Sequence, residues 1–197
     1  MMLSRHNALF AIGLTSVLLS ACSTDDGRQM SPPISTQVAT VTPSPNTQSS
    51  PSGWTVTAPW VNGGEVNIRY TCDGEGLSPP LVWTQGPEMA RAYGVVLSPT
   101  NDPATVLWAM ANIEPTTRNL VEGLAPTNAL VGVNSAGSVG YQAPCPDVGQ
   151  SQQFDLSVYA QEFPLELPQN SPAVDIAATL ENEALEIVST QFVYQRR

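Results

Sequence analysis

Apolar segments alternate with glycine, proline and asparagine along residues 54–197. The segments are rich in valine, threonine and aromatic side chains, which is typical of strands in antiparallel sheets. The predicted strands are 54–57, 65–71, 81–84, 91–97, 106–113, 153–161 and 186–195. This pattern predicts a mainly β fold, and one domain is the default expectation because the 144 residues are about one ordinary domain long and enough to bury a core.

The Gly86-Pro87 pair separates two of these segments, and we expect a hairpin there. Trp83 and Tyr93 flank the turn as apolar anchors. We interpret both aromatic side chains as core residues rather than as a stacking surface for a ligand.

One helix is predicted from residue 171 onward. Ser171 can cap it, Pro172 suits its first turn, and Asp175 stands where the helix dipole favours an acid. The apolar positions at helical spacing are Val174, Ala177, Leu180 or Glu181, and Ala184. This face is expected to pack on a sheet rather than on a membrane, because the opposite face is acidic.

The first residues of the chain indicate an export signal. An apolar stretch, 8–19, follows Arg5 and is too short to span a bilayer as a helix. It ends in Leu19-Ser20-Ala21-Cys22, which resembles the lipobox of bacterial lipoproteins. We therefore expect a signal peptide over 1–21, cleavage before Cys22, and palmitate-type acyl chains that hold the protein to the extracytoplasmic face of the cell membrane. An ordinary secretory peptide or an uncleaved anchor is the alternative.

Residues 22–53 are rich in serine, threonine, proline, glutamine and asparagine. Such a segment cannot bury enough apolar surface to offset its ordering entropy. We predict a disordered tether between the lipidated cysteine and a domain that begins at Trp54.

The formal net charge is −10, and it becomes −11 when Arg5 leaves with the signal peptide. The acids are scattered rather than grouped in blocks, which is typical of a solvated surface. Nucleic acid and anionic lipid headgroups are poor partners for such a surface, because it would repel both, and we predict no nucleic-acid partner.

Histidine and lysine are the informative absences. His6 lies in the signal peptide, and the sequence contains no lysine. The mature chain therefore lacks the residues for Ser-His-Asp or Cys-His nucleophiles, imidazole metal sites and Schiff-base chemistry. We predict no enzyme activity, no cofactor and no metal. A carboxylate pair of the kind that glycosidases use is the remaining alternative.

Once Cys22 carries lipid, Cys72 and Cys145 form an even pair in an oxidising compartment. We expect a disulfide between them. Two buried free thiols are the alternative.

The segment 70–83, which reads YTCDGEGLSPPLVW, resembles the phosphatidylethanolamine-binding protein family in its bacterial Raf-kinase-inhibitor-like branch. Further segments match in order: Leu107-Trp108, Asn112-Ile113, Glu122-Gly123, Gly140 through Pro146, Tyr159-Ala160 and Tyr194. The resemblance implies two antiparallel sheets in a Greek-key arrangement, one or two short helices and a small anion-binding pocket.

This sequence departs from the family at the implied pocket. The family's Asp-Pro-Asp-x-Pro loop is replaced by a stretch in which both acids become hydroxyls, and the family's three pocket histidines are all lost. The residues implied for the pocket are Asp73, Ser98, Thr100, Asp102, Leu107, Pro144, Gln152 and Glu183, of which Leu107, Gln152 and Glu183 take the histidine positions and Asp102 takes part only through a shift of the loop. Anion binding should be weak, since Leu107 desolvates the pocket and Glu183 repels an anion. Arg69, Arg91 and Arg118 are the arginines that could restore positive charge there.

Two functions are consistent with these observations. The first is an envelope-anchored, non-catalytic binding module for a neutral or weakly polar small molecule. The second is a protein-interaction or inhibitor module that acts on another envelope protein. A purely structural interpretation also stands, in which Asp73 caps its own loop and Pro144 shapes a turn.

Overall fold

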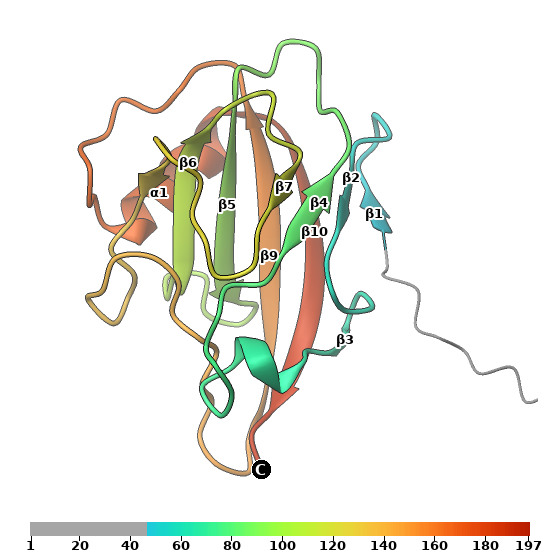
Figure 1. The fold of residues 1–197 in the computed structure, drawn as a ribbon, viewed down its shortest axis with the longest axis vertical. Helices are drawn as coiled ribbons and strands as arrows, with labels where there is room; N and C mark the ends of the chain where they lie inside the picture. Colours follow the sequence, from blue (N-terminus) through green and yellow to red (C-terminus); the bar gives the residue numbers. More distant parts are fainter. Residues whose placement is uncertain (1–46) are drawn as a thin grey trace, which may run out of the picture. The chain divides into compact units, whose positions relative to one another are not determined.

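The computed structural model describes residues 47–197 (Figure 1). The predictions for the signal peptide, for Cys22 and for the tether up to residue 46 lie outside the described residues. Within 47–197, no helix combines the length and the hydropathy that a bilayer span requires.

The strands form two sheets. The four-stranded sheet has the order β1-β2-β4-β7, and the six-stranded sheet has the order β3-β10-β9-β5-β6-β8. The elements of the four-stranded sheet are β1 (Thr47–Ser49), β2 (Thr55–Thr57), β4 (Leu81–Trp83) and β7 (Asn119–Leu120). Those of the six-stranded sheet are β3 (Gly64–Glu65), β10 (Ala184–Gln195), β9 (Ser151–Gln161), β5 (Ala92–Pro99), β6 (Trp108–Ile113) and β8 (Leu130–Val131).

All neighbouring strands are antiparallel except β3 and β10, which run parallel. A 3₁₀ helix, η1 (Ile68–Tyr70), and one α-helix, α1 (Ala173–Glu183), complete the described fold. Figure 1 shows the two sheets as separate layers, with α1 on the side of the six-stranded sheet that faces away from the four-stranded one. The mainly β, two-sheet prediction is confirmed.

Large side chains fill the space between the sheets. Trp54 and Trp83 each contact Tyr93 with ring centroids 5.7 Å apart, and Phe154 stacks on Phe192 at 5.2 Å. All five side chains are buried in one continuous cluster. Because a sheet needs a covered apolar face to be stable, this inter-sheet cluster is the main core.

The opposite face of the six-stranded sheet carries small residues. Trp108 and Met110 of β6 point into the inter-sheet core, while Ala109 and Ala111, which alternate with them, belong to the cluster under α1. Alternation along a strand places successive side chains on opposite faces. The small residues allow α1 to lie close to the sheet.

The face that the helix buries matches the predicted one only in part. Ala173, Ile176 and Leu180 are buried, whereas Val174 is 43% exposed and Ala184 already belongs to β10. Of the predicted positions, Leu180 is buried and Ala177 is partly buried against the same cluster, whereas Val174 is not covered and the buried Ala173 and Ile176 were not predicted.

The helix start was also only partly predicted. Ser171 donates its hydroxyl hydrogen bond to the carbonyl of Pro168, 2.8 Å away, so it does not cap the helix. The residue before the helix is Pro172, whose side chain makes no capping hydrogen bond. Asp175 lies in the first turn, as predicted.

The strand predicted at 65–71 is wrong beyond Glu65. The side-chain oxygen of Asn67 accepts a hydrogen bond from the backbone N–H of Arg69, 2.9 Å away, and η1 follows. A local side-chain contact of this kind diverts the backbone from a ladder. Ile68 consequently lies 57% exposed.

The hairpin predicted around Gly86 is wrong, because β4 and β5 belong to different sheets. The turn instead carries the chain from one sheet to the other. Trp83 and Tyr93 still meet across it as core residues, as predicted. A Cβ on Gly86 would lie 2.9 Å from the Tyr93 hydroxyl oxygen, so the close approach requires glycine.

The folded unit starts earlier than Trp54. β1 lies inside the segment predicted as tether and pairs with β2, Thr47 opposite Thr57. The hydroxyl of Ser52 donates to the Glu186 carboxylate at 2.7 Å, and the backbone N–H of Ser52 donates to the same group at 3.3 Å. These contacts fasten residues 47–53 to the domain.

Candidate functional site

Five of the predicted pocket residues gather at one end of the six-stranded sheet. Thr100 follows β5, and its backbone N–H donates to the carbonyl of Gln153 in β9, 2.9 Å away. Leu107 precedes β6 and donates to Leu97 of β5 at 2.9 Å. Gln152 pairs in register with Tyr194 of β10. The strand ends therefore bring Thr100, Leu107 and Gln152 to the same end of the sheet.

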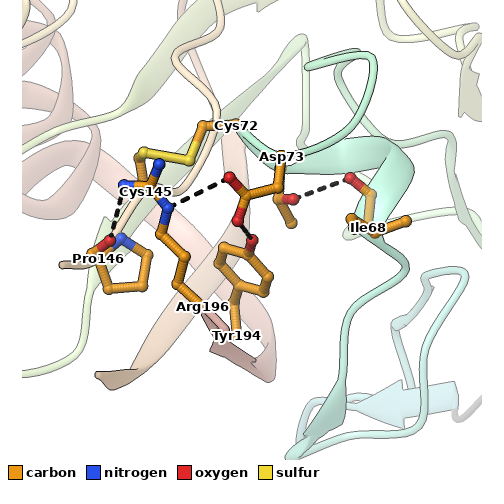
Figure 2. The surroundings of a disulfide bond; sticks show 8 residues. Ile68, Cys72, Asp73, Cys145, Pro146, Tyr194 and Arg196 are labelled. Carbon is orange, nitrogen blue, oxygen red and sulfur yellow. Dashed lines mark hydrogen bonds and ion pairs between the residues drawn. A yellow bond between two sulfur atoms is a disulfide. The ribbon is translucent and has the colours of Figure 1, made fainter. Parts of the chain in front are cut away.

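A disulfide joins two loops at this end of the sheet (Figure 2). Cys72 is bonded to Cys145, as predicted, with 5.4 Å between their Cα atoms and a sequence separation of 73. The backbone N–H of Cys72 also donates to the carbonyl of Pro144 at 3.2 Å. Asp73 and Pro144, the other two gathered residues, are thus held side by side.

Asp73 is the centre of a polar cluster at this end (Figure 2). One carboxylate oxygen accepts a short hydrogen bond from the Tyr194 hydroxyl, and the other accepts one from Nε of Arg196 at 3.2 Å. The Arg196 guanidinium also donates to the carbonyl of Pro146 at 3.3 Å. Asp73 therefore joins the two loops to the end of β10, and it does not cap its own loop.

Burial of the Tyr194 phenol, together with its hydrogen bond to Asp73, raises the pKa of Tyr194. The phenol consequently stays protonated at neutral pH and donates to the carboxylate. The loop that presents Asp73 is tight, because a Cβ on Gly74 would overlap the carbonyl oxygen of Ile68. Glycine is required at that close approach.

The position that the family fills with a histidine is apolar and closed. Leu107 is 5% exposed and belongs to the inter-sheet core. Its carbonyl accepts a hydrogen bond from the backbone N–H of Gln142 at 2.8 Å. The side-chain oxygen of Gln142 is buried and has no hydrogen-bond partner among the described residues.

The structure does not bring the remaining predicted residues into this cluster. Ser98 belongs to β5, but it lines a groove beside α1 on the other face of the sheet. Asp102 accepts a hydrogen bond from the Thr105 hydroxyl at 2.6 Å and shapes the β5–β6 loop. Glu183 ends α1 next to Ala184, which pairs with Gln161 at the opposite end of the sheet.

None of the three arginines considered from the sequence contacts the Asp73 cluster. Arg69 donates to Glu75 and, at 2.6 Å, to Glu122. Arg91 donates to the Glu88 carbonyl, and Arg118 donates to backbone carbonyls and lies over a ring in the core. The arginine that does reach the cluster is Arg196, which sequence reasoning missed together with the role of Tyr194.

A cavity of about 420 Å³ opens beside Asp73 and Tyr194. Glu65, Ile68 and Arg197 also line it. The Asp73 and Arg196 side chains remain 32% and 30% exposed. Arg196 is therefore paired with the Asp73 carboxylate, and the other charged side chains that line the cavity are one acid, Glu65, and one arginine, Arg197.

Comparisons with known proteins identify the class of protein to which this two-sheet fold belongs. The sequence profile of the phosphatidylethanolamine-binding protein family matches residues 56–195. The chain belongs to this family, as the sequence resemblance predicted.

Relatives from several organisms support the assignment. A protein of Methanothermobacter thermautotrophicus from the group named UPF0098 is 31% identical over 140 residues, which is 68% of this chain and 92% of that protein. LppC of Mycobacterium tuberculosis, provisionally named a lipoprotein, is 27% identical over 168 residues, which is 81% of this chain and 80% of LppC.

Two crystal structures show the same fold. CT736 of Chlamydia trachomatis, described as a homologue of the phosphatidylethanolamine-binding protein, matches with a TM-score of 0.63 at 23% identity, over 72% of this chain and 97% of its own. YbcL of E. coli, described as a new member of the mammalian family, matches with a TM-score of 0.66 at 21% identity, over 72% of this chain and 98% of its own.

Proposed function

We propose that this protein is an exported, lipid-anchored and non-catalytic binding module whose family pocket accepts a neutral or weakly polar small molecule instead of a phosphate group. The observation that carries the proposal is the pair of changes at one end of the sheet. Leu107 occupies a histidine position inside the core, and the nearby cation, Arg196, is paired with Asp73. Phosphate binding needs hydrogen-bond donors and positive charge; Leu107 supplies neither, and the Arg196–Asp73 pair leaves Arg197 as the one cationic side chain in the lining of the adjoining cavity.

Absence of catalysis follows from the sequence in this proposal. With no lysine in the chain and with His6 as its single histidine, general-base and nucleophilic chemistry at neutral pH lack their usual groups. The hydrogen-bonded Asp73 and Tyr194 are engaged with each other and with Arg196. They serve as structure at the pocket edge.

Location at the envelope rests on the Leu19 to Cys22 signal and on the lipoprotein name of the LppC relative. Intact mass spectrometry of the membrane-extracted protein tests it. We expect a new N-terminus at Cys22 that carries acyl chains, and an unmodified Cys22 would contradict the proposal.

Calorimetric titration tests the ligand preference. The full mature chain with Cys22→Ser, which carries no lipid, is titrated with phosphate and with phosphoethanolamine. We expect dissociation constants of about 1 mM or weaker, which is about −4 kcal/mol and within reach of a few neutral donors. Micromolar binding of either anion by the unchanged pocket would overturn the proposal.

Restored imidazoles sharpen the same test. Leu107→His should raise phosphate affinity, most clearly below about pH 6.5, where the imidazole becomes charged. Gln152→His, at the partly exposed start of β9, is a second variant in case the buried position does not tolerate histidine. Glu183→His is the matched control, because Glu183 lies at the opposite end of the sheet. An equal gain in the control would show that the cluster is not the anion site.

The alternative from the sequence, a module that acts on another envelope protein, stays a prediction. Crosslinking of the lipidated protein to membrane proteins of its host would test it.

A further inference from the structure

The fold leaves part of the helix's apolar surface uncovered. Helix α1 buries Ile176 and Leu180 against the sheet, with Ala177 partly buried beside them, and turns Val174 outward. Val174 is 43% exposed as a result. A single exposed apolar side chain is common on a protein surface, so the feature that calls for a role is the groove that Val174 borders.

A groove of about 440 Å³ runs along this surface. One wall is α1, with Val174, Ala177 and Glu181, and the other comes from β5 and β9, with Val96, Ser98 and Tyr159. The volume is at the lower end of the range that small-molecule sites occupy. The groove lies on the opposite face of the six-stranded sheet from Leu107, so it is separate from the family pocket.

A polar pair closes one part of the groove. The Tyr159 hydroxyl donates to one oxygen of the Glu181 carboxylate at 3.1 Å. Tyr159 is 6% exposed, and burial, helped by the nearby Glu181 charge, raises the pKa of its phenol well above the ordinary value. The phenol therefore stays protonated and donates a hydrogen bond to Glu181. The second oxygen of the exposed Glu181 carboxylate keeps spare capacity to accept a hydrogen bond.

The charges of the residues that line the groove determine which polar group a bound molecule can carry. Glu181 offers a negative charge, and none of the residues that line the groove is cationic. A charged donor gains both a charge-assisted hydrogen bond and the attraction of a protein with a formal net charge of −10. An anionic group would be repelled at the same place.

We propose that this groove binds a small amphiphilic ammonium compound, with its apolar part against Val96, Val174 and Ala177 and its ammonium group on the Glu181 carboxylate. The site is additional to the family pocket and needs no anion there. Its ligand class is a primary amine on a short hydrocarbon body.

Three probes with the same six-carbon chain separate the contribution of the ammonium group from that of the hydrocarbon. Hexylammonium, hexanol and hexanoate are titrated into the full mature chain with Cys22→Ser, and amide chemical shifts are followed by NMR. We expect hexylammonium to bind about tenfold more tightly than hexanol and to shift amides of α1, β5 and β9, because one charge-assisted hydrogen bond accounts for about a tenfold change. Hexanoate should bind more weakly than hexanol.

Variants then locate the site. Glu181→Gln should reduce hexylammonium affinity about tenfold and leave hexanol unchanged. Glu183→Gln is the matched control, because this substitution removes the same charge from the same end of the helix. Glu183 is exposed and does not line the groove. Ala177→Leu should weaken both probes by filling the groove.

The proposal is overturned if hexylammonium binds no better than hexanol, if Glu181→Gln and Glu183→Gln lose affinity equally, or if the shifts appear away from α1. It is also overturned if Leu107→His, on the other face, abolishes hexylammonium binding. That last result would place the amine in the family pocket, and it would leave the phosphate test of the proposed function unaffected.

Discussion

The two faces of the six-stranded sheet are covered in different ways. The inner face meets the other sheet through large rings, such as Tyr93 of β5 against Trp83 of β4 with ring centroids 5.7 Å apart. The outer face meets a single helix through small residues, such as Gly94 and Ala109. Large side chains from two sheets interdigitate and close the inner space, whereas one helix cannot span the width of a six-stranded sheet. The closed face therefore provides stability, and the partly covered face keeps a groove.

Removing a ring from the inner face should have the largest effect. Phe154→Ala deletes a side chain that is 1% exposed, and a cavity of that size lowers the free energy of unfolding by about 3–5 kcal/mol. Val174→Ala on the outer face is the comparison, and its cost should stay within about 0.5 kcal/mol. Urea unfolding of both variants measures the difference. Similar losses would contradict the contrast between the faces.

The disulfide should rank next, because it holds the loops beyond the end of the inner core. Replacing Cys72 and Cys145 together by alanine should lower the free energy of unfolding by about 2–4 kcal/mol, since the reduced chain regains a long open loop when it unfolds. The m-value will change as well if the unfolded chain expands. Thiol labelling of the denatured, unreduced protein should detect no thiol from either residue. Two reactive thiols would show that the bond does not form in the cell.

A glycine on the outer face tests how closely the helix approaches. A Cβ on Gly94 would lie 2.5 Å from a methyl carbon of Leu180, which is fully buried and has little room to move. Gly94→Ala should therefore cost about 1–3 kcal/mol through overpacking. Gly94→Ala combined with Leu180→Ala provides the control, because the smaller partner removes the clash. If the single variant is neutral, the helix can lift from the sheet and the groove is not fixed in shape.

The contrast between the faces also explains which parts of the fold the sequence predicts. Strands that alternate across the closed face, such as β5 and β9, were predicted close to their observed bounds. The strand predicted after Glu65 was wrong because one local contact, between the Asn67 side chain and the Arg69 backbone, outweighs a strand-like composition. The Gly86 hairpin failed because pairing partners far along the chain decide which sheet a strand joins.

The candidate site was also predicted only in part, and local motifs account for the part that was predicted. Local motifs identified Asp73, Leu107 and Pro144, which the structure brings to one end of the sheet. Tyr194 and Arg196 were missed, because they reach Asp73 across 121 and 123 residues and no local spacing indicates that contact. Glu183 was assigned to the pocket by its place in the family order alone, and the strand register carries it to the far end of the sheet.

The smallest effect is expected at β1, which lies at the edge of the four-stranded sheet. Burial disfavours the charged form of Glu186, but hydrogen bonds from Ser50 and Ser52 outweigh it and lower the pKa of Glu186. A carboxyl with a lowered pKa in the folded state stabilises the fold above its unfolded pKa, and this contribution is lost as the pH falls through the folded pKa. β1 should consequently loosen below about pH 4, the ordinary range of a glutamate.

Hydrogen exchange measures this loosening directly. Protection factors of the β1 amides should fall on acidification, whereas those of the β9 amides, which lie between two long strands, should not. Glu186→Gln should reproduce the loosening at neutral pH, at a cost of at most about 1 kcal/mol because the contact is near the surface. Glu183→Gln, an exposed acid on the neighbouring helix, should leave β1 unchanged. If β1 stays protected in acid and in Glu186→Gln, strand pairing alone holds the end of the tether, and the serine contacts contribute nothing to it.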